Sequence, residues 1–557
     1  MSYRRFKSRF APGASNPADF VGVEAVPAVA LFPNAPSPSA AFDWRRRAID
    51  YDSFVYDWSQ PGQFPTIAWD HTHYNMSSDT YKLPSYYGDD RLDTDGTQEA
   101  LGQIASVVGA TLVGIDKSNQ DGIDYVDMLR TFYWPSLGIA RNEPTVQTAV
   151  AGQADLNGGD SYWYTTAANV LYYMLGAQYP NATSMTEMLR SIADKFYDQV
   201  VALGGASANF DGQGFNFSTR TKNAGNRNEG GDGAVGTAAI ELWAYAKFGD
   251  TRYLQAAKWS MDYLERSSSS LFYEILPQLA PYLAARMNAQ FGTDYNVRKY
   301  FDWILGGSVA RPGWGTILQR WGSYDAHGLI GSQTDGGGYA FAMNTFSAPL
   351  FAATAKYDPR FADTVGRWML NVHNAARFYY ADQMPVGNQW YGARYINDPA
   401  HVIPYEGLRA TENGHTPNAT GDPSTYGQHW GLNTDVTTDL GLYGGSWVGF
   451  LGGSVSSTNV PNVLRTDLNA LDFHATSSDP TYLYYNPTSS PVEVEVTLTG
   501  ASDLYDEVTD RMLLQNVSGA QTVTIPPGST ILVIAPLTGS VSHRERVDDT
   551  EREPKAD

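Results

Sequence analysis

The chain contains no cysteine among its 557 residues. It therefore has no disulfide framework, no thiol nucleophile and no thiolate metal ligand, a composition that fits a secreted bacterial protein and a cytosolic one equally well. Charged residues are also scarce at 17%, and acids outnumber bases to give a net charge of −21. Nucleic-acid binding needs a clustered basic surface, so we expect no nucleic-acid partner. The same charge disfavours a strongly anionic polymer as substrate, although a local basic patch could overcome it.

Long apolar runs are missing as well. The first ten residues, MSYRRFKSRF, contain an arginine pair, but no apolar stretch follows it, so we expect no signal peptide in the sequence as it stands. Residues 440–464 carry no charge, yet Gly, Ser and Asn break their apolarity, which argues against a membrane span. We expect no membrane partner, and the localisation stays unassigned.

Several catalytic motifs are absent. The sequence has no HExxH motif, no EF-hand spacing, no phosphate-binding glycine loop between a strand and a helix, and no Gly-x-Ser-x-Gly elbow. We therefore expect neither a metal nor a cofactor.

Aromatic residues are abundant: 36 Tyr, 23 Phe and 14 Trp make up 13% of the chain. Large rings bury large areas, so they can simply fill a core. Many of them, however, lie in loops rich in Gly, Asn and Asp, where flat rings suit stacking on sugar faces. Both interpretations stay open at this stage.

A two-helix unit recurs along the chain. Residues 232–248 are rich in small residues at helical spacing, Gly249 and Asp250 form a tight turn, and residues 251–266 predict a more amphipathic helix. The same pattern predicts a helix over 338–356 followed by one to about 374, and a helix over 160–178 followed by one over 184–203. Further helices are predicted at 97–114, 122–133, 272–290 and 295–305.

These units predict a mainly α fold. Helices of small residues can pack on both sides, while amphipathic partners expose one face, so alternating them gives concentric layers, as in an (α/α)6-type toroid. The loops before the inner helices then converge on one mouth. The alternative is an open α-solenoid used for protein binding.

Alternating patterns near the C-terminus predict a small antiparallel β-sandwich, with strands at 482–485, 492–496, 521–525 and 530–534. The predicted organisation is an extended arm over 1–41, a toroid over 42–460, a β-sandwich over 467–540 and a disordered tail over 541–557.

The chain resembles bacterial carbohydrate-active enzymes built on an (α/α) toroid. The resemblance rests on Lys247–Ala257 (KFGDTRYLQAA), on its echo at Lys356–Phe361, and on Leu504–Val533, which looks like the terminal β-sandwich of many such hydrolases and lyases. It covers about four-fifths of the chain. Such toroids host glycosidases and polysaccharide lyases alike, so the resemblance implies an architecture and carries over no catalytic residue.

Glycoside hydrolysis usually needs two carboxyl groups, one protonated and one ionised. Glu229 and Asp232 lie on a glycine-rich loop that enters a small-residue helix, so we expect them to point into the mouth. Asp325 and Asp335 occupy a second loop-rich stretch with three successive glycines, which allow close approach of a substrate. Glu406 and Glu412 lie in a long polar insertion, a common place for function. Each of these acids can equally be a helix cap or a surface residue.

The predicted partner is a carbohydrate, and the candidate catalytic residues are the six acids named above. The candidate substrate-binding residues, which are aromatic or polar and lie in the same loops or near the N-terminus, are Trp69, Asp70, His71, Trp321, Tyr324, His327, Tyr339, Tyr405, His429 and Trp430.

Three functions stay open. The first is a glycoside hydrolase acting on a neutral oligo- or polysaccharide. The second is a polysaccharide lyase, in which Tyr339, His327, Tyr405, His415 and Arg409 would matter more than the acids. The third is a glycan-binding protein without catalysis. Oligomeric state, linkage and stereochemical outcome are not predicted.

Overall fold

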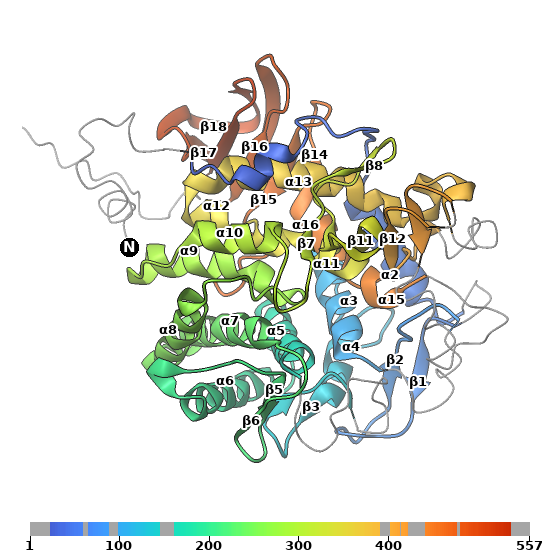
Figure 1. Ribbon diagram of the computed structural model, residues 1–557, viewed down its shortest axis with the longest axis vertical. Helices are drawn as coiled ribbons and strands as arrows, with labels where there is room; N and C mark the ends of the chain where they lie inside the picture. Colours follow the sequence, from blue (N-terminus) through green and yellow to red (C-terminus); the bar gives the residue numbers. More distant parts are fainter. Residues whose placement is uncertain are drawn as a thin grey trace, which may run out of the picture.

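The computed structural model describes residues 23–59, 65–88, 98–144, 161–389, 401–412, 414–420, 440–475 and 479–535. Within these ranges the chain is mainly helical, with a sheet domain at its C-terminal end (Figure 1). None of the helices in these ranges combines the length and the apolarity that crossing a membrane demands.

Six helical segments of the described ranges form an inner layer. They are α3 (Ala100–Leu112), α5 (Tyr162–Gln178), α7 (Gly230–Phe248), η7 (Leu276–Leu279) with α9 (Ala280–Phe291), α11 (Ala342–Phe346) with η9 (Ala348–Phe351), and α15 (Leu442–Gly445) with α16 (Val448–Ser454). Each inner segment contacts the next one in the order α3, α5, α7, η7, η9 and α16. The last of them, α16, contacts α3 again. The inner layer is therefore a closed ring, which confirms the toroid and excludes an open solenoid.

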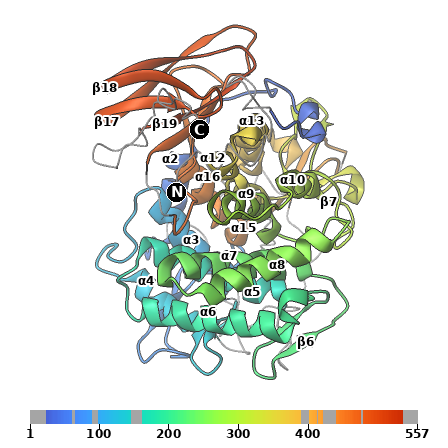
Figure 2. The same ribbon diagram turned by 90° about the vertical axis from the view of Figure 1, so that its left-hand side faces the viewer.

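An outer layer covers this ring. It consists of α2 (Trp44–Val55), α4 (Tyr125–Met128) with η4 (Leu129–Phe132), α6 (Met185–Ala202), α8 (Thr251–Arg266), α10 (Val297–Leu305) and α13 (Ala362–Ala376). Each of α6, α8, α10 and α2 packs against an inner helix, and Figure 2 shows α6 and α8 lying outside α7 and α5. The closing inner helix, α16, takes its outer partner α2 from the beginning of the chain.

The α7–α8 pair shows how the sequence makes the two layers. The first fifteen residues of α7 are all buried, because Gly and Ala let neighbours approach from every side. Gly249 ends the helix in the left-handed conformation, at φ 72°, and the Asp250 carboxylate caps α8 by accepting from the Arg252 N–H at 2.9 Å. Only one stripe of α8 is buried, as expected for an outer helix.

The predicted continuous helix over 338–356 is wrong. The segment instead forms a strand, β11 (Tyr339–Phe341), followed by α11, η9 and the short α12 (Thr354–Tyr357). Gly338 has φ 137°, which no helix allows, and Pro349 is the second residue of the 3-10 turn η9. The strand forms because β11 pairs with β12 (Gly407–Arg409), far away in sequence.

A small antiparallel sheet contains this strand. Its order is β13 (Asn418–Thr420), β12, β11, β10 (Ile330–Ser332) and β7 (Trp314–Thr316). The sheet leads directly into α11, so it lies at the end of the ring where the inner helices begin.

The C-terminal domain is a six-stranded antiparallel sheet, confirming the predicted β domain (Figure 1). The strand order is β14 (Val455–Ser457), β15 (Leu464–Asp467), β16 (Thr481–Tyr485), β19 (Thr530–Ile534), β17 (Val492–Asp506) and β18 (Arg511–Ile525). The sheet therefore begins at Val455, earlier than the predicted boundary at 467. Register shifts between Leu498 and Tyr505 let the far half of the β17–β18 hairpin fold over the sheet and bury a second apolar cluster.

The N-terminal segment 23–41 runs over the ring beside α13. The N–H of Glu24 donates to the Arg360 carbonyl at 3.0 Å, and the Asn371 side chain donates to the Pro33 carbonyl at 3.1 Å. The remaining 3-10 turns are η2 (Pro27–Leu31), η6 (Gly205–Ser207), η8 (Asp335–Gly337), η10 (Pro359–Phe361), η11 (Arg377–Tyr379), η12 (Ala381–Gln383) and η13 (Val386–Asn388). The two-stranded hairpins pair β1 (Ala68–Asp70) with β2 (Thr80–Lys82), β3 (Tyr133–Trp134) with β4 (Ile139–Ala140), β5 (Gly214–Asn216) with β6 (Thr221–Asn223), and β8 (Arg320–Trp321) with β9 (Tyr324–Asp325).

Candidate active site

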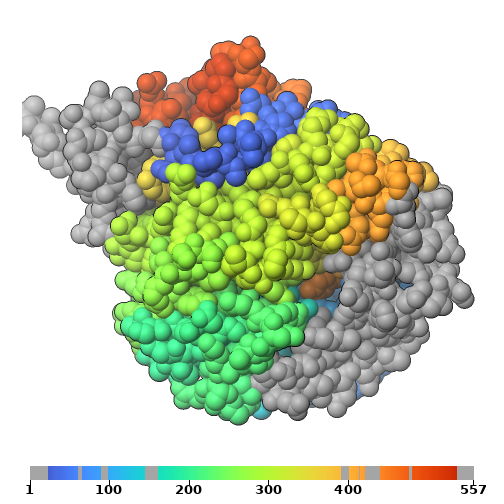
Figure 3. All heavy atoms as spheres, viewed as in Figure 1, coloured from blue at the N-terminus to red at the C-terminus, as the bar shows by residue number. Residues whose placement is uncertain are grey.

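Side chains from the starts of the inner helices surround one space, which we call the mouth. Burial raises the pKa of Tyr443 on α15, and the charges of Glu99 before α3 and Glu274 before η7 raise it further. Burial likewise raises the pKa of Tyr164 on α5, followed by the charges of Glu99, Glu274 and Glu229. Groups from α3, α5, α7, η7 and α15 are therefore close enough to influence one another. Figure 3 shows a hollow between the green and yellow-green parts of the surface, with orange and blue atoms at its floor.

Glu229 precedes α7 and is buried. Its Oε2 accepts hydrogen bonds from the Ser161 hydroxyl and from the Trp163 N–H, the latter at 3.1 Å. Its Oε1 lies 3.6 Å from the Arg227 Nε. Burial raises the pKa of Glu229, and the hydrogen bonds and Arg227 partly oppose that rise.

Asp232 lies in the first turn of α7 and is fully buried. Its Oδ2 accepts from the backbone N–H of Glu274 at 3.2 Å, whereas its Oδ1 has no partner in the described part of the chain. Burial raises the pKa of Asp232 well above its usual range, and the charges of Glu274 and Glu229 add to the rise. Asp232 thus holds the backbone at Glu274 through its Oδ2.

Glu274 faces the same space and pairs with Arg311. Burial raises the pKa of Glu274, while the Arg311 charge and the Asn344 side chain on α11 lower it. The segment approaches α7 closely because residue 231 is glycine: a Cβ there would lie 2.0 Å from the Leu271 carbonyl oxygen. A glycine at the start of α7 thus places Glu274 beside Asp232 and Glu229.

Aromatic rings continue the wall of the mouth. The Arg311 guanidinium lies 3.4 Å from the centroid of the Trp314 ring. Trp314 contacts Phe341 with ring centroids 6.4 Å apart, and Phe341 stacks on Tyr443 at 6.3 Å. Cation–π and ring contacts of this kind hold side chains in fixed orientations. The Arg227 Nη1 donates to the Tyr273 hydroxyl at 3.3 Å, and the Tyr273 ring centroid lies 5.6 Å from the Arg311 guanidinium.

Of the other candidate acids, Glu406 lies beside the mouth. Its Oε1 accepts from the Tyr86 hydroxyl at 2.9 Å, and Tyr86 in turn influences Tyr443. Asp335 and Glu412 lie further out: the Asp335 side chain is 58% exposed, and both carboxylates flank Arg409, at 3.2 and 3.8 Å.

Asp325 lies in a different environment, beneath the N-terminal segment. It pairs with Arg320 at 3.0 Å and accepts from the Ser37 N–H. The His327 ring packs edge-on against Phe32 at 6.1 Å, and burial lowers its pKa. These partners belong to the outer side of the ring next to α13, so the structure does not bring Asp325 or His327 to Glu229 and Asp232.

The remaining substrate-binding candidates of this region are mostly packed into the fold. Trp321 is buried against Gly338, and Tyr324 meets Phe378 edge-on at 5.1 Å. Tyr339 lies behind Trp314, with ring centroids 6.4 Å apart, and the buried Tyr405 hydroxyl donates to the Gln389 Oε1 at 2.9 Å. His327 has quite different neighbours from both tyrosines, so the structure does not pair His327 with either of them.

Near the N-terminus, Trp69 stacks on Trp58 with centroids 4.3 Å apart and is 40% exposed. Asp70 is buried and accepts from the Gln98 side chain, and His71 pairs with Asp79 at 2.8 Å. His429 and Trp430 lie outside the described residues.

Within the described ranges, Trp69 is the one aromatic ring among the large exposed hydrophobic side chains. The high aromatic content therefore serves the core first. Across the same ranges no three His, Asp or Glu side chains are grouped so that they could hold a metal ion.

The sequence analysis missed Glu274 and Arg311. Glu274 sits between apolar residues, in FYEIL, and so looks like part of a core helix. A usable signal exists nonetheless: Glu99, Glu229 and Glu274 each stand just before an inner helical segment, at equivalent places in the repeat.

Comparisons with known proteins give little more. No family model matches the chain, and no curated protein matches it. Among solved structures, it is similar to a GH127 beta-L-arabinofuranosidase from Geobacillus stearothermophilus T6, with 11% identity, a TM-score of 0.36, and coverage of 90% of this chain and 82% of that one. A second GH127 beta-arabinofuranosidase gives 10% identity, a TM-score of 0.39 and coverage of 91% and 80%. A protein described as a glycoside hydrolase gives 10%, 0.33, and 84% and 77%. Since all three TM-scores lie below 0.5, the fold assignment rests on the closed ring itself.

Proposed function

We propose that this chain is a glycoside hydrolase acting on a neutral oligo- or polysaccharide, with Glu274 and Glu229 as its catalytic carboxyl groups. The observation that carries the proposal is the convergence of buried acids, two arginines and aromatic rings at the starts of the inner helices. Hydrolysis of a glycosidic bond needs one carboxyl group to protonate the leaving oxygen and another to act as base or nucleophile.

The surroundings of the two acids favour different roles. Glu229 is the proton donor in this proposal, since burial raises its pKa and Arg227 approaches no closer than 3.6 Å. Glu274 is the ionised partner, because it forms a direct ion pair with Arg311. A raised pKa keeps a carboxyl group protonated closer to neutral pH, where it can act as an acid.

Asp232 is a positioning residue in this scheme. It is fully buried and holds the Glu274 backbone through its Oδ2. Asparagine has the same size and an oxygen that can accept the same hydrogen bond, so Asp232→Asn should retain most of the activity.

We infer a neutral substrate from the charges of the mouth and of the whole chain. Each arginine of the mouth lies beside a carboxyl group, Arg311 beside Glu274 and Arg227 beside Glu229. The chain as a whole carries −21. A uronate polymer would meet repulsion from the protein and would have to displace these pairs.

To test the proposal, the protein is incubated with a panel of neutral glycans and aryl glycosides. Hydrolysis is measured as the release of reducing ends. Glu274→Gln and Glu229→Gln should each lower kcat by about 10²–10⁴-fold, the usual contribution of a general acid or base. The matched control is Glu241→Gln, which changes a fully buried glutamate more than two turns along α7 from the mouth and should leave kcat unchanged.

Two outcomes would overturn the proposal. One is full activity in both mouth variants. The other is formation of an unsaturated product absorbing in the ultraviolet, which would indicate elimination instead of hydrolysis. If hydrolysis is observed, proton NMR of the first-formed anomer establishes whether the reaction retains or inverts configuration.

A further inference from the structure

A second concave site lies at the other end of the ring from the mouth. It is a cavity of about 400 Å³ where α5, α7 and α12 end and where residues 468–475, which follow β15 of the C-terminal sheet and which we call the linker, pass. Its lining includes Lys247 of α7, Lys356 of α12, and Asn469, Asp472 and His474 of the linker. A cavity of this volume suits a small molecule.

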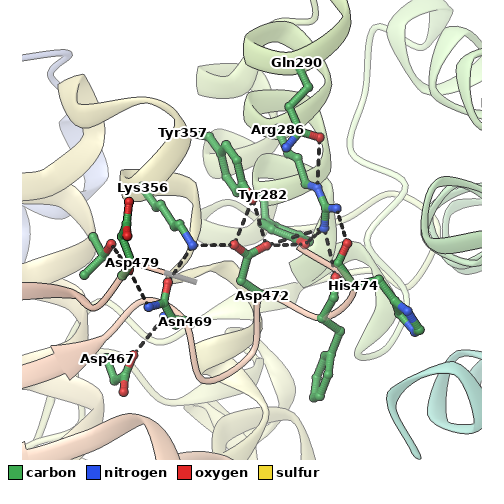
Figure 4. Close-up of polar contacts among 12 residues, drawn as sticks. Tyr282, Arg286, Gln290, Lys356, Tyr357, Asp467, Asn469, Asp472, His474 and Asp479 are labelled. Atoms are coloured by element: carbon green, nitrogen blue, oxygen red, sulfur yellow. Dashed lines mark hydrogen bonds and ion pairs between the residues drawn. The ribbon is translucent and has the colours of Figure 1, made fainter. Parts of the chain in front are cut away.

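The linker side of the cavity is a fixed polar network around Asp472 (Figure 4). The Asp472 carboxylate accepts from the Tyr282 hydroxyl at 2.9 Å and from the Tyr357 hydroxyl at 2.8 Å. It also pairs with Lys356 at 2.9 Å and with the buried Arg286 at 3.4 Å. Arg286 further donates to the carbonyls of Phe473 and His474, so the wall is rigid before any ligand arrives.

The lining of the cavity carries more positive than negative charge, with Lys247 and Lys356 against Asp472. Asp472 is the one carboxylate in its lining, and it already faces two cations, Arg286 and Lys356. Lys247 adds a third. No carboxylate in the described ranges pairs with Lys247, whose ammonium lies 5.9 Å from the centroid of the Phe248 ring. A surplus of positive charge in a concave site attracts anions, and here it stands out against a net charge of −21.

The pKa of His474 is affected by the same positive charges. Burial lowers its pKa to about 4, and the charges of Lys247 and Arg286 contribute to the lowering. The ring is therefore neutral, and its Nε2 donates to the Tyr173 carbonyl at 2.9 Å. The histidine cannot supply a counter-charge, and the surplus remains.

We propose that this cavity binds a small oxyanion, a phosphate- or carboxylate-bearing molecule, through Lys247. The bound anion would connect the end of α7 to the linker, and thereby the ring to the C-terminal sheet. The site is separate from the mouth and does not depend on the function proposed for it. Lys247 is free to turn toward a ligand, while the Asp472 network supplies the preformed wall.

The experiment uses the full chain in a phosphate-free buffer. Inorganic phosphate and citrate are titrated separately by calorimetry, and thermal unfolding is followed with each anion and with sodium chloride at equal ionic strength. With at least one of the anions we expect saturable binding of about one molecule per chain and a higher Tm. Which of the two anions binds shows whether the site recognises phosphate or carboxylate.

Lys247→Met should weaken that binding about tenfold or more, the loss expected for one charge-assisted hydrogen bond. Lys258→Met, which removes the same charge from α8, should bind like wild type. Absence of binding to wild type, equal stabilisation by sodium chloride, or unchanged binding in Lys247→Met would overturn the proposal. Circular dichroism of each variant confirms that a loss of binding is not a loss of fold.

Discussion

Two inner helices, α3 and α16, approach each other closely where the ring closes. A Cβ added at Gly449 would lie 2.3 Å from the Gly109 carbonyl carbon and oxygen. Carbon atoms need about 3.5 Å, so Gly449→Ala requires the two helices to separate by about 1 Å. Overpacking of this kind costs about 1–3 kcal/mol, partly offset by about 1 kcal/mol of better helix propensity.

Gly102, on the same helix α3, provides the matched control. A Cβ there would meet only the Ser446 Oγ, at 3.9 Å, an ordinary contact. Gly102→Ala should therefore be neutral or stabilising by up to about 1 kcal/mol. Urea unfolding followed by tryptophan fluorescence compares the two variants. If Gly449→Ala proves as stable as Gly102→Ala, the α3–α16 closure described above is incorrect.

The remaining predictions concern buried charges. Glu241→Gln should raise stability at pH 8 but not at pH 4, because burial raises the pKa of Glu241 and the folded state must keep a proton that the unfolded chain loses as pH rises; equal midpoints at both pH values would contradict this. Asp472→Asn should destabilise the fold by about 3–5 kcal/mol by leaving Arg286 buried without its counter-ion, measurable by urea unfolding. Asp232→Asn should unfold at nearly the same urea concentration as wild type, whereas Asp232→Ala should lose about 1–3 kcal/mol with the hydrogen bond to Glu274.

The local sequence is a good guide wherever neighbours in the chain decide the structure. The α7–α8 pair follows from small residues, a left-handed glycine at 249 and a capping aspartate at 250, all within a short span. The C-terminal strands follow from alternation in the same way, as β16 and β19 show.

Prediction from the sequence fails where contacts between distant segments determine the local structure. The strand β11 exists because residues 407–409 pair with it, and nothing near residue 339 signals that partner. Glu274 joins the mouth because the closed ring brings the segment before η7, at Leu271, against Gly231. Asp335 precedes three glycines whereas Glu274 lies between apolar residues, so the sequence alone ranks Asp335 above Glu274 as a site residue.

The pairing of α2 with α16 sets the order in which the molecule can be completed. Tyr51 and Ser446 are hydrogen-bonded at 3.1 Å although 395 positions separate them. A ribosome therefore has to deliver nearly the whole helical region before its first and last helices can meet, and the nascent protein carries an unfinished apolar seam for most of its synthesis. A circular permutant that begins at a surface turn such as Gly249–Asp250 would join α16 and α2 early in synthesis. It would thereby shorten the time for which the apolar seam is exposed.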